Sequence, residues 1–337
     1  MRLAYIRCNA NHETGYGHVS RCLSLAMELR KLGFECQFFL GSPDARTALE
    51  NAGFYCHVLP NKDQDGKHFT DIASRTRPGL VVLDVRPALG AHAVLQLKAS
   101  GCLVAAIDDI SCGSLLCDVV YLPPHPAVMR AQFNDNVLAR RGLSWVIIGN
   151  GLDLSDIEPA HHPFKNLLMC MGGSDPWGYT ERLAPRMARA CARLGMNAGV
   201  VVGPGFKDRE RLMGCLRSDG VTVFDAPTNM KSVYSWADAA ISTVCVGAYE
   251  LAAAGRPTLY VCPDSDYAEH ATVFENANLG LRIQDENEDL CSLLEKLANL
   301  GDVSPEIDSL GASRIARDMN SLLLKHAGKF SRKMATH

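Results

Sequence analysis

His18 follows two glycines, Gly15 and Gly17, in the sequence GYGHVSR near the N-terminus. A neutral imidazole can accept a proton, and a helix start at this point would disfavour its charged form. The glycines let the backbone approach a ligand closely, and the free N–H groups of a helix start favour an anionic or oxygen-rich ligand. The pattern predicts a general base beside a ligand-binding loop. A plain turn with a capping or surface histidine fits the same spacing.

The flanking residues indicate which elements hold this loop. Residues 3–6 form a short apolar run, and the segment after His18 has apolar residues spaced for one helical face. A strand, a glycine loop and a helix in this order are typical of a doubly wound α/β domain. The loop is not the dinucleotide fingerprint G-x-G-x-x-G, because Ser20 stands where the third glycine should be. This disfavours a nicotinamide-dependent oxidoreductase.

Carboxylates follow two further strands that we expect in the first half. Residues 79–84 and 103–109 are nearly continuous apolar runs, as expected for strands covered on both faces of a parallel sheet. They deliver Asp84, Asp108 and Asp109 to the carboxyl edge, where open α/β sheets bind ligands. Capping of the next helix would explain the same carboxylates equally well.

The second half repeats the alternation. We place the domain boundary after residue 156, so that residues 1–156 and 157–337 form two domains of α/β class facing a cleft. The second domain opens with a strand and the loop Gly172-Gly173-Ser174. A later helix carries Glu250, whose carboxylate could accept hydrogen bonds from a ribose diol. A solvated glutamate on a helix surface is the alternative.

The composition is that of an ordinary globular protein, and it disfavours nucleic acid and membrane surfaces as partners. The 337 residues are 47% hydrophobic and 21% charged, and the formal net charge of −3 gives no electrostatic case for nucleic acid or a membrane surface. No apolar run is long enough for a membrane span, and the N-terminus lacks the pattern of a signal peptide. The 13 cysteines are scattered, without a C-x-x-C pair. We therefore expect a cytoplasmic protein without a disulfide framework or a zinc site.

Several stretches together resemble one family. They are Gly15 to His18 with Arg21, residues 171–175, and residues 242–250 with 253–257. They are similar to motifs of the PseG family, UDP-2,4-diacetamido-2,4,6-trideoxy-β-L-altropyranose hydrolases of pseudaminic acid biosynthesis. That family is related to spore-coat polysaccharide proteins and to MurG-type glycosyltransferases of GT-B fold. The resemblance covers residues 2 to about 281.

The resemblance implies a GT-B-like pair of Rossmann-like domains and a role for each site residue. His18 would activate water for attack on the anomeric carbon, with UDP leaving and the configuration inverted. The resemblance implies no metal ion and no cofactor. The residues implied in nucleotide binding are Thr243, Val244, Cys245, Val246, Gly247 and Glu250. Those implied in substrate binding are Arg7, Asn9, Gly15, Tyr16, Gly17, Arg21, Asp84, Arg86, Gly172, Gly173, Ser174, Asp266 and Tyr267.

Four positions depart from the family pattern, and all are expected near the sugar. Asn9 replaces an aspartate, Arg86 stands where a tyrosine is usual, Gly149 replaces an arginine, and Asp266-Tyr267 replaces an Asn-Gln pair. We therefore expect nucleotide binding to be retained, whereas the sugar or the acceptor differs.

The sequence thus predicts a UDP-sugar hydrolase with a small-molecule substrate, acting as a monomer or a weak dimer. An inverting glycosyltransferase would use the same base and the same nucleotide site. A non-catalytic nucleotide-sugar sensor is a third possibility. It would bind UDP without any turnover that depends on His18.

Overall fold

The chain folds into two compact units, each built on a parallel β-sheet. The computed structural model describes residues 2–9, 17–60, 66–85, 89–149, 152–301 and 307–334. The first unit takes residues 2–9 and 18–149 and again the residues from 310 onward, and the second takes residues from 152 to 309.

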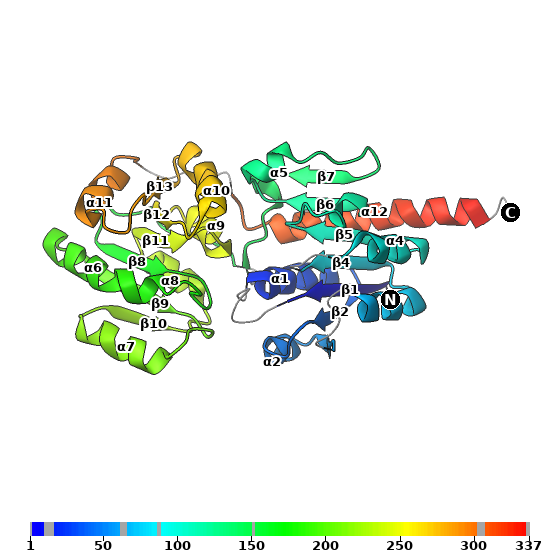
Figure 1. Ribbon diagram of the computed structural model, residues 1–337, viewed down its shortest axis with the longest axis horizontal. Coiled ribbons are helices and arrows are strands. Elements are labelled where there is room, and N and C mark those ends of the chain that lie inside the picture. Colours follow the sequence, from blue (N-terminus) through cyan, green and yellow to red (C-terminus); the bar gives the residue numbers. More distant parts are fainter. Residues whose placement is uncertain are drawn as a thin grey trace. The chain divides into compact units, whose positions relative to one another are not determined.

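The first unit has, within the described residues, seven parallel strands in the order β3-β2-β1-β4-β5-β6-β7 (Figure 1). Its strands are β1 (Arg2–Cys8), β2 (Phe34–Leu40), β3 (Tyr55–Val58), β4 (Leu80–Asp84), β5 (Leu103–Ile107), β6 (Val119–Leu122) and β7 (Leu138–Arg141). Its helices are α1 (Gly17–Lys31), α2 (Arg46–Asn51), α3 (Lys67–Thr76), α4 (Ala91–Ala99), α5 (Pro126–Arg130) and α12 (Gly311–Met334), with short 3₁₀ helices η1 (Ser114–Leu116) and η2 (Leu143–Trp145).

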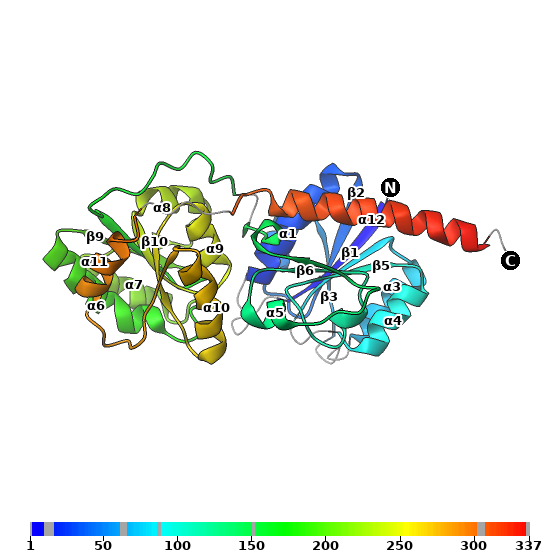
Figure 2. The same ribbon diagram turned by 90° about the horizontal axis from the view of Figure 1, so that it is seen from above.

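Helices cover both faces of this sheet. Every residue of β4 and β5 is buried, as expected of strands enclosed between two helical layers. On one face, Phe69 of α3 and Val94 and Leu97 of α4 join a core cluster with alternate strand residues. On the other face lie α1 and α12, seen side by side in Figure 2. The helical layers on both faces hold the strands in place. They therefore also position the start of α1, which follows the carboxyl end of β1.

The second unit repeats the design with, among the described residues, six parallel strands in the order β10-β9-β8-β11-β12-β13. Its strands are β8 (Asn166–Cys170), β9 (Asn197–Val202), β10 (Thr222–Asp225), β11 (Ala239–Thr243), β12 (Thr258–Val261) and β13 (Gly280–Arg282). Its helices are α6 (Tyr179–Leu194), α7 (Arg209–Ser218), α8 (Met230–Trp236), α9 (Val246–Ala253), α10 (Ser265–Asn276) and α11 (Leu290–Ala298).

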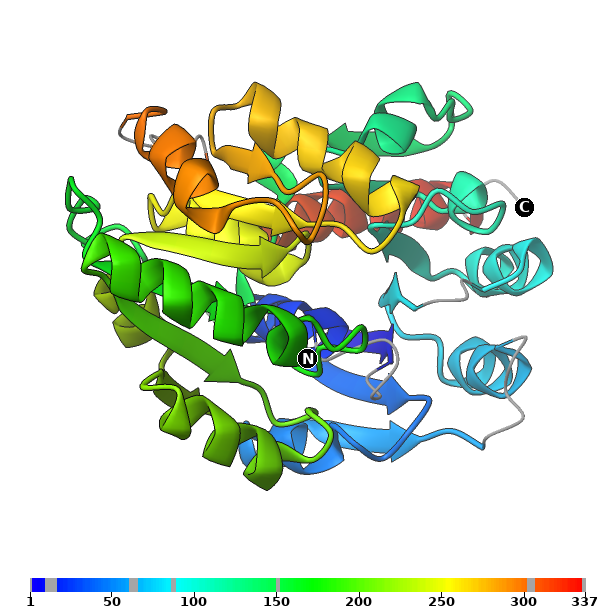
Figure 3. The ribbon, with the colours of Figure 1, turned by 60° about the vertical axis from the view of Figure 1, so that its left-hand side comes forward.

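One face of the second sheet holds a large apolar core. Side chains of α6, α7 and α11 pack there against β8, β9, β11 and β12. Figure 3 shows these helices, in green and orange, on that face. α8, α9 and α10 cover the opposite face (Figure 1). The doubly wound α/β class predicted from the alternation of apolar segments is therefore confirmed for both units.

The last helix differs from its expected place. The sequence boundary assigned residues 157–337 to one domain, but α12 belongs to the first unit. The reason is packing: Ile315, Ala316 and Met319 of α12 are fully buried, and Asp318 accepts hydrogen bonds from Arg140 and from the hydroxyl of Tyr121. The helix continues to Met334.

Candidate active site

In the first unit, His18 and a strand-end aspartate meet at the carboxyl edge of the sheet. β1, β4 and β5 are neighbours, and Cys8 of β1 pairs with Asp84 of β4. His18 is the second residue of α1, and its Nδ1 lies 2.6 Å from Oδ1 of Asp84. A carboxylate can only accept a hydrogen bond, so the imidazole proton is assigned to Nδ1. Nε2 then carries the lone pair that can take a proton, as in Ser-His-Asp triads.

Arg21 holds the other side of the same carboxylate. Its Nε donates to Oδ2 of Asp84 at 2.7 Å, and one terminal nitrogen donates to Oδ1 at 2.6 Å. The other terminal nitrogen donates to Oδ2 of Asp108 at 3.0 Å. All three guanidinium nitrogens thus bond protein groups, and the side chain is buried. Arg21 therefore binds both Asp84 and Asp108, and the substrate contact that the family resemblance implies for it stays a prediction.

The charges of this cluster are mutually stabilised. Burial alone would raise the pKa of Asp84, but the positive charge of Arg21 and the contact with His18 outweigh it and hold the pKa well below its usual range. Burial lowers the pKa of Arg21, but Asp84 and Asp108 more than offset this, so the net pKa is raised. Burial also raises the pKa of the Cys22 thiol, which remains protonated and lies 3.3 Å from Oδ2 of Asp84 as a donor. Asp84 is therefore a buried carboxylate, with a side chain only 1% exposed.

The two carboxylates after β5 have different surroundings. Asp108 adopts a left-handed backbone conformation, with φ of 55°, and its side chain is 26% exposed. Asp109 closes a turn by accepting hydrogen bonds from the backbone N–H and the hydroxyl of Ser111, both at 2.9 Å. A local turn with Ser111, and not the cap of the next helix, thus accounts for Asp109, whereas Asp108 belongs to the cluster around His18.

Arg7 and Asn9 bind each other at the end of β1. Arg7 donates to Oδ1 of Asn9 at 2.6 Å and to the carbonyl of Cys8 at 3.1 Å, and the same Oδ1 accepts from the backbone N–H of Gly41. A Cβ atom on Gly41 would lie 2.5 Å from that oxygen, so a larger residue there would displace the Asn9 side chain. Arg7 is buried. Of the remaining residues predicted near His18, Gly17 begins α1, while Gly15, Tyr16 and Arg86 lie outside the described residues.

In the second unit, the predicted nucleotide loop joins β11 to α9. Thr243 ends β11, Val244 is buried, Cys245 is the N-cap residue, and Val246 and Gly247 form the first turn of α9. The first N–H groups of a helix have no partner within the helix and carry a partial positive charge. This end of α9 is suited to an anionic ligand.

Glu250 lies in the second turn of α9. It is buried, and its Oε2 accepts a hydrogen bond of 2.6 Å from the hydroxyl of Tyr234 in α8. Burial, followed by the charge of Glu250, raises the pKa of Tyr234 well above its usual value, so the phenol stays a donor. The alternative of a solvated glutamate on a helix surface is therefore wrong.

The predicted glycine loop after β8 is held by its neighbours. Gly172 has a φ of 79°, and Asp175 caps α6 by accepting from the N–H groups of Tyr179 and Thr180 at 3.0 and 2.7 Å. A Cβ atom on Gly172 would lie 3.9 Å from Sγ of Cys245, so this loop adjoins the loop before α9. The carbonyl of Gly173 accepts from the N–H of Gly205, and Ser174 is buried.

Asp266 and Tyr267 lie in the first turn of α10. Oδ1 of Asp264 accepts from both of their backbone N–H groups, at 2.9 and 3.1 Å. Asp266 is exposed, and the ring of Tyr267 meets the ring of Trp177 edge to face, with centroids 5.1 Å apart. Sequence reasoning missed Trp177. A large aromatic residue directly after a glycine loop was the available signal.

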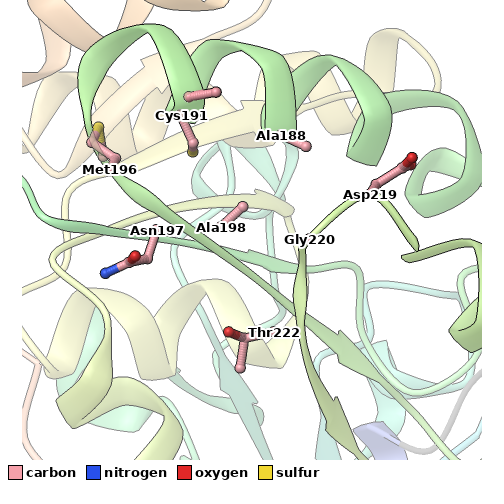
Figure 4. A pocket seen from close by; sticks show the side chains of 9 residues that line it. Ala188, Cys191, Met196, Asn197, Ala198, Asp219, Gly220 and Thr222 are labelled. Atoms are coloured by element: carbon pink, nitrogen blue, oxygen red, sulfur yellow. The ribbon is translucent and has the colours of Figure 1, made fainter. Parts of the chain in front are cut away.

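Two cavities lie elsewhere. Figure 4 shows one of about 180 Å³ near the first residues of β9 and β10, where Asn197, Ala198 and Thr222 line it. The other, of about 390 Å³, includes Phe34 and Phe54 near the starts of β2 and β3. Both lie at amino ends of strands, away from the carboxyl edges described above, and neither is lined by a predicted site residue.

Two further properties bear on the predicted partners. No helix within the described residues is long and apolar enough to cross a membrane. In that same part of the chain, no three His, Cys, Asp or Glu side chains are grouped so that they could hold a metal ion.

The whole chain is similar in structure to enzymes of GT-B fold. MurG of Acinetobacter baumannii matches with a TM-score of 0.63 and 14% identity over 95% of this chain and 100% of its own. The UDP-GlcNAc 2-epimerase of Methanocaldococcus jannaschii, in complex with UDP-GlcNAc and UDP, matches with 0.61 and 11% over 95% and 100%. The spinosyn rhamnosyltransferase SpnG, complexed with thymidine diphosphate, matches with 0.58 and 13% over 99% and 100%. No protein-family model and no curated protein matches the sequence. The predicted GT-B-like fold of two Rossmann-like domains is confirmed.

Proposed function

We propose that this chain hydrolyses a UDP-sugar at the anomeric carbon, with His18 as the general base. The observation that carries the proposal is the imidazole whose Nδ1 is 2.6 Å from the buried carboxylate of Asp84 at the carboxyl edge of the first sheet. Such a contact fixes the tautomer and the orientation of the ring and stabilises the imidazolium that forms when Nε2 takes a proton. Asp84 and Arg21 are positioning residues in this proposal.

The second unit is the proposed UDP side. The N–H groups at the start of α9 are suited to the diphosphate, and buried Glu250 is suited to the ribose hydroxyls. The epimerase that shares this fold forms a complex with UDP-GlcNAc and UDP, which supports a UDP-sugar ligand. The first unit, carrying His18, is the proposed sugar side.

The proposed reaction breaks one bond and forms another. The oxygen of a water molecule attacks the anomeric carbon while a water proton passes to Nε2 of His18. The bond from that carbon to the β-phosphate oxygen breaks, and UDP leaves with the electron pair. Helix N–H groups aimed at the phosphate stabilise the developing charge. Attack opposite to the leaving group inverts the configuration.

The proposed sugar is a diacetamido-trideoxy sugar of the pseudaminic acid type. The motifs around His18, residues 171–175 and Glu250 support this choice by their similarity to the PseG family. The departures at Asn9, Arg86, Gly149 and Asp266-Tyr267 fall at positions expected near the sugar, so a related sugar is the first alternative to test.

The test is UDP release by the purified chain from a panel of UDP-sugars in water, followed with and without sugar or lipid acceptors. We expect release in water alone, with an inverted anomer seen by NMR. Release that needs an acceptor would replace the proposal with an inverting glycosyltransferase. The rhamnosyltransferase SpnG, one of the enzymes that share the fold, is compatible with that second candidate.

Two substitutions separate the proposed base from the proposed nucleotide site. His18→Gln should lower kcat by about 10²- to 10⁴-fold and leave the Kd for UDP unchanged, because general-base catalysis typically contributes this much. Glu250→Gln, the matched control, should weaken UDP by about tenfold, since it removes the negative charge from hydrogen bonds to the ribose. Steady-state kinetics and calorimetric titration with UDP give both numbers. Full activity in His18→Gln would show that another group is the base.

A further inference from the structure

An aromatic pair stands at the carboxyl edge of the second sheet. Trp177, from the loop after β8, and Tyr267, from the first turn of α10, meet with an interplanar angle of 76°. Trp177 is 38% exposed although it is a large apolar side chain. Both residues are held at the backbone: Arg182 donates to the carbonyl of Trp177 at 2.5 Å, and Asp264 accepts from the N–H of Tyr267 at 3.1 Å. The pair is therefore a fixed and partly exposed apolar surface.

The strand order places this pair across the end of β11. β8 and β12 are not neighbours, because β11 lies between them, so their ends are about 10 Å apart at the usual strand spacing. A contact between residues that follow β8 and β12 must therefore pass across the carboxyl end of β11, where α9 begins. Two contacts agree: the Cβ position of Gly172 is 3.9 Å from Sγ of Cys245, and the hydroxyl of Tyr249 in α9 lies 2.7 Å from Nε2 of His270 in α10.

The pair lies on the opposite flank of α9 from the proposed ribose contact. Glu250 is bonded to Tyr234 of α8, the helix before β11, whereas Tyr267 is on α10, the helix after β12. A nucleoside bound at Glu250 and a diphosphate bound at the start of α9 leave the α10 flank to the group that the diphosphate carries. That group is the sugar.

We propose that Trp177 and Tyr267 form an aromatic subsite that packs against an acetamido sugar attached to the diphosphate. This inference rests on the proposed function. Ring faces attract C–H groups and other apolar groups, so they fit the apolar face and acetyl methyl of such a sugar better than a fully hydroxylated face. Trp177 is thus a specificity residue for the sugar and not a nucleotide contact.

The test compares two ligands, UDP and UDP-GlcNAc, by calorimetric titration. Trp177→Ala should weaken UDP-GlcNAc by about tenfold and change the Kd for UDP by less than twofold, and Tyr267→Ala should act in the same direction. Trp177→Phe keeps an aromatic ring and should retain most of the affinity. Tyr55→Ala, which removes a 66% exposed aromatic ring from the first unit, is the matched control and should change neither Kd.

Other results of these titrations would overturn the subsite, the choice of sugar or the proposed function. Equal weakening of UDP and UDP-GlcNAc by Trp177→Ala would make the pair a nucleotide contact, and no effect on either ligand would remove it from the site. Binding of UDP without binding of UDP-GlcNAc would overturn the acetamido-sugar assignment alone. If the wild-type chain bound neither ligand, the proposed function itself would fail, and the subsite with it.

Fluorescence gives a second readout that does not depend on activity. The chain has 3 tryptophans, so Trp145→Phe with Trp236→Phe leaves Trp177 as the single indole. UDP-GlcNAc should change its emission, and UDP should not. Identical responses to both ligands would contradict a sugar contact.

Discussion

At the scale of single residues, the cluster around His18 depends on one buried carboxylate. Asp84 accepts hydrogen bonds from His18, from two nitrogens of Arg21 and from Cys22. Because Arg21 neutralises Asp84, the carboxylate can stay ionised in a buried place and still orient the imidazole. Removing its charge should therefore disturb both the proposed general base and the folded state.

Asp84→Asn should lose stability in a manner that depends on pH. The pKa of Asp84 is lowered in the folded chain, so its stabilisation is fully present above the unfolded value of about 4 and is lost as the pH falls through the folded pKa. Above pH 5 the variant leaves the buried Arg21 charge with Asp108 as its remaining carboxylate partner, and removing one partner of a buried ion pair typically costs about 3–5 kcal/mol. Urea unfolding of both proteins between pH 3 and pH 7 should show this gap shrinking below about pH 4.

The control is Asp135→Asn, an exposed carboxylate of the same unit. Its free energy of unfolding should follow that of the wild type at every pH. A gap between wild type and Asp84→Asn that stayed constant down to pH 3 would mean that the Asp84 carboxylate does not carry the stabilisation.

At the scale of elements, close backbone approach fixes the glycine loop after β8. A Cβ atom on Gly203, at the end of β9, would lie 2.4 Å from the carbonyl oxygen of Gly173 and 2.7 Å from its Cα. The atoms that it would meet belong to the backbone and cannot rotate away. The loop that adjoins the start of α9 thus owes its position to a glycine on the neighbouring strand.

Gly203→Ala should destabilise the chain by about 1–3 kcal/mol, the usual cost of overpacking. It should also weaken the binding of UDP, since the displaced loop adjoins Cys245. The matched variant is Gly214→Ala in the exposed side of α7, where a Cβ atom meets nothing within 4 Å. That change should stabilise the chain by about 0.5–1 kcal/mol through helix propensity. Denaturant unfolding measures both, and equal effects at the two glycines would contradict the argument.

Some helices and strands could be predicted from the sequence, and others could not. The fully apolar runs at β4 and β5 predicted buried strands, and the pattern after His18 predicted α1. By contrast, α4 and the edge strand β7 were missed, because Leu138–Arg141 ends in two arginines and lacks a buried-strand pattern. The order of the strands, which brings Asp84 beside His18, is a long-range property that no local pattern contains.

The candidate site was predictable in its residue types more than in its contacts. Sequence reasoning put His18 and Asp84 at element ends, where α/β proteins bind ligands, and Glu250 inside a helix that follows a strand. It could not assign Arg21 to Asp84 and Asp108, since 63 and 87 residues separate the partners. Nor could it find that Asp175 caps α6 or that Trp177 meets Tyr267, because both depend on the course of a loop.

At the scale of the whole molecule, each unit has its own hydrophobic core, and the chain returns through α12 to pack on the core of the first unit. Asp318 of α12 accepts two hydrogen bonds from Arg140, at 2.9 and 3.1 Å, and one from Tyr121. The residues proposed to bind UDP are all in the second unit. A ligand stabilises the folded state of the unit that binds it, by about 2.7 kcal/mol when the free ligand concentration is a hundred times Kd.

Calorimetric unfolding with and without UDP should therefore show two transitions, of which UDP raises only one. Asp318→Asn should lower the free energy of unfolding of the first unit by about 1–3 kcal/mol, because it weakens charge-assisted hydrogen bonds to α12. It should leave the shift that UDP causes in the other transition unchanged. Glu250→Gln should reduce the UDP shift and leave the transition that depends on α12 in place. One transition that both UDP and Asp318→Asn displaced would mean that the units unfold together. In that case α12 would couple nucleotide binding to the stability of the unit that carries His18.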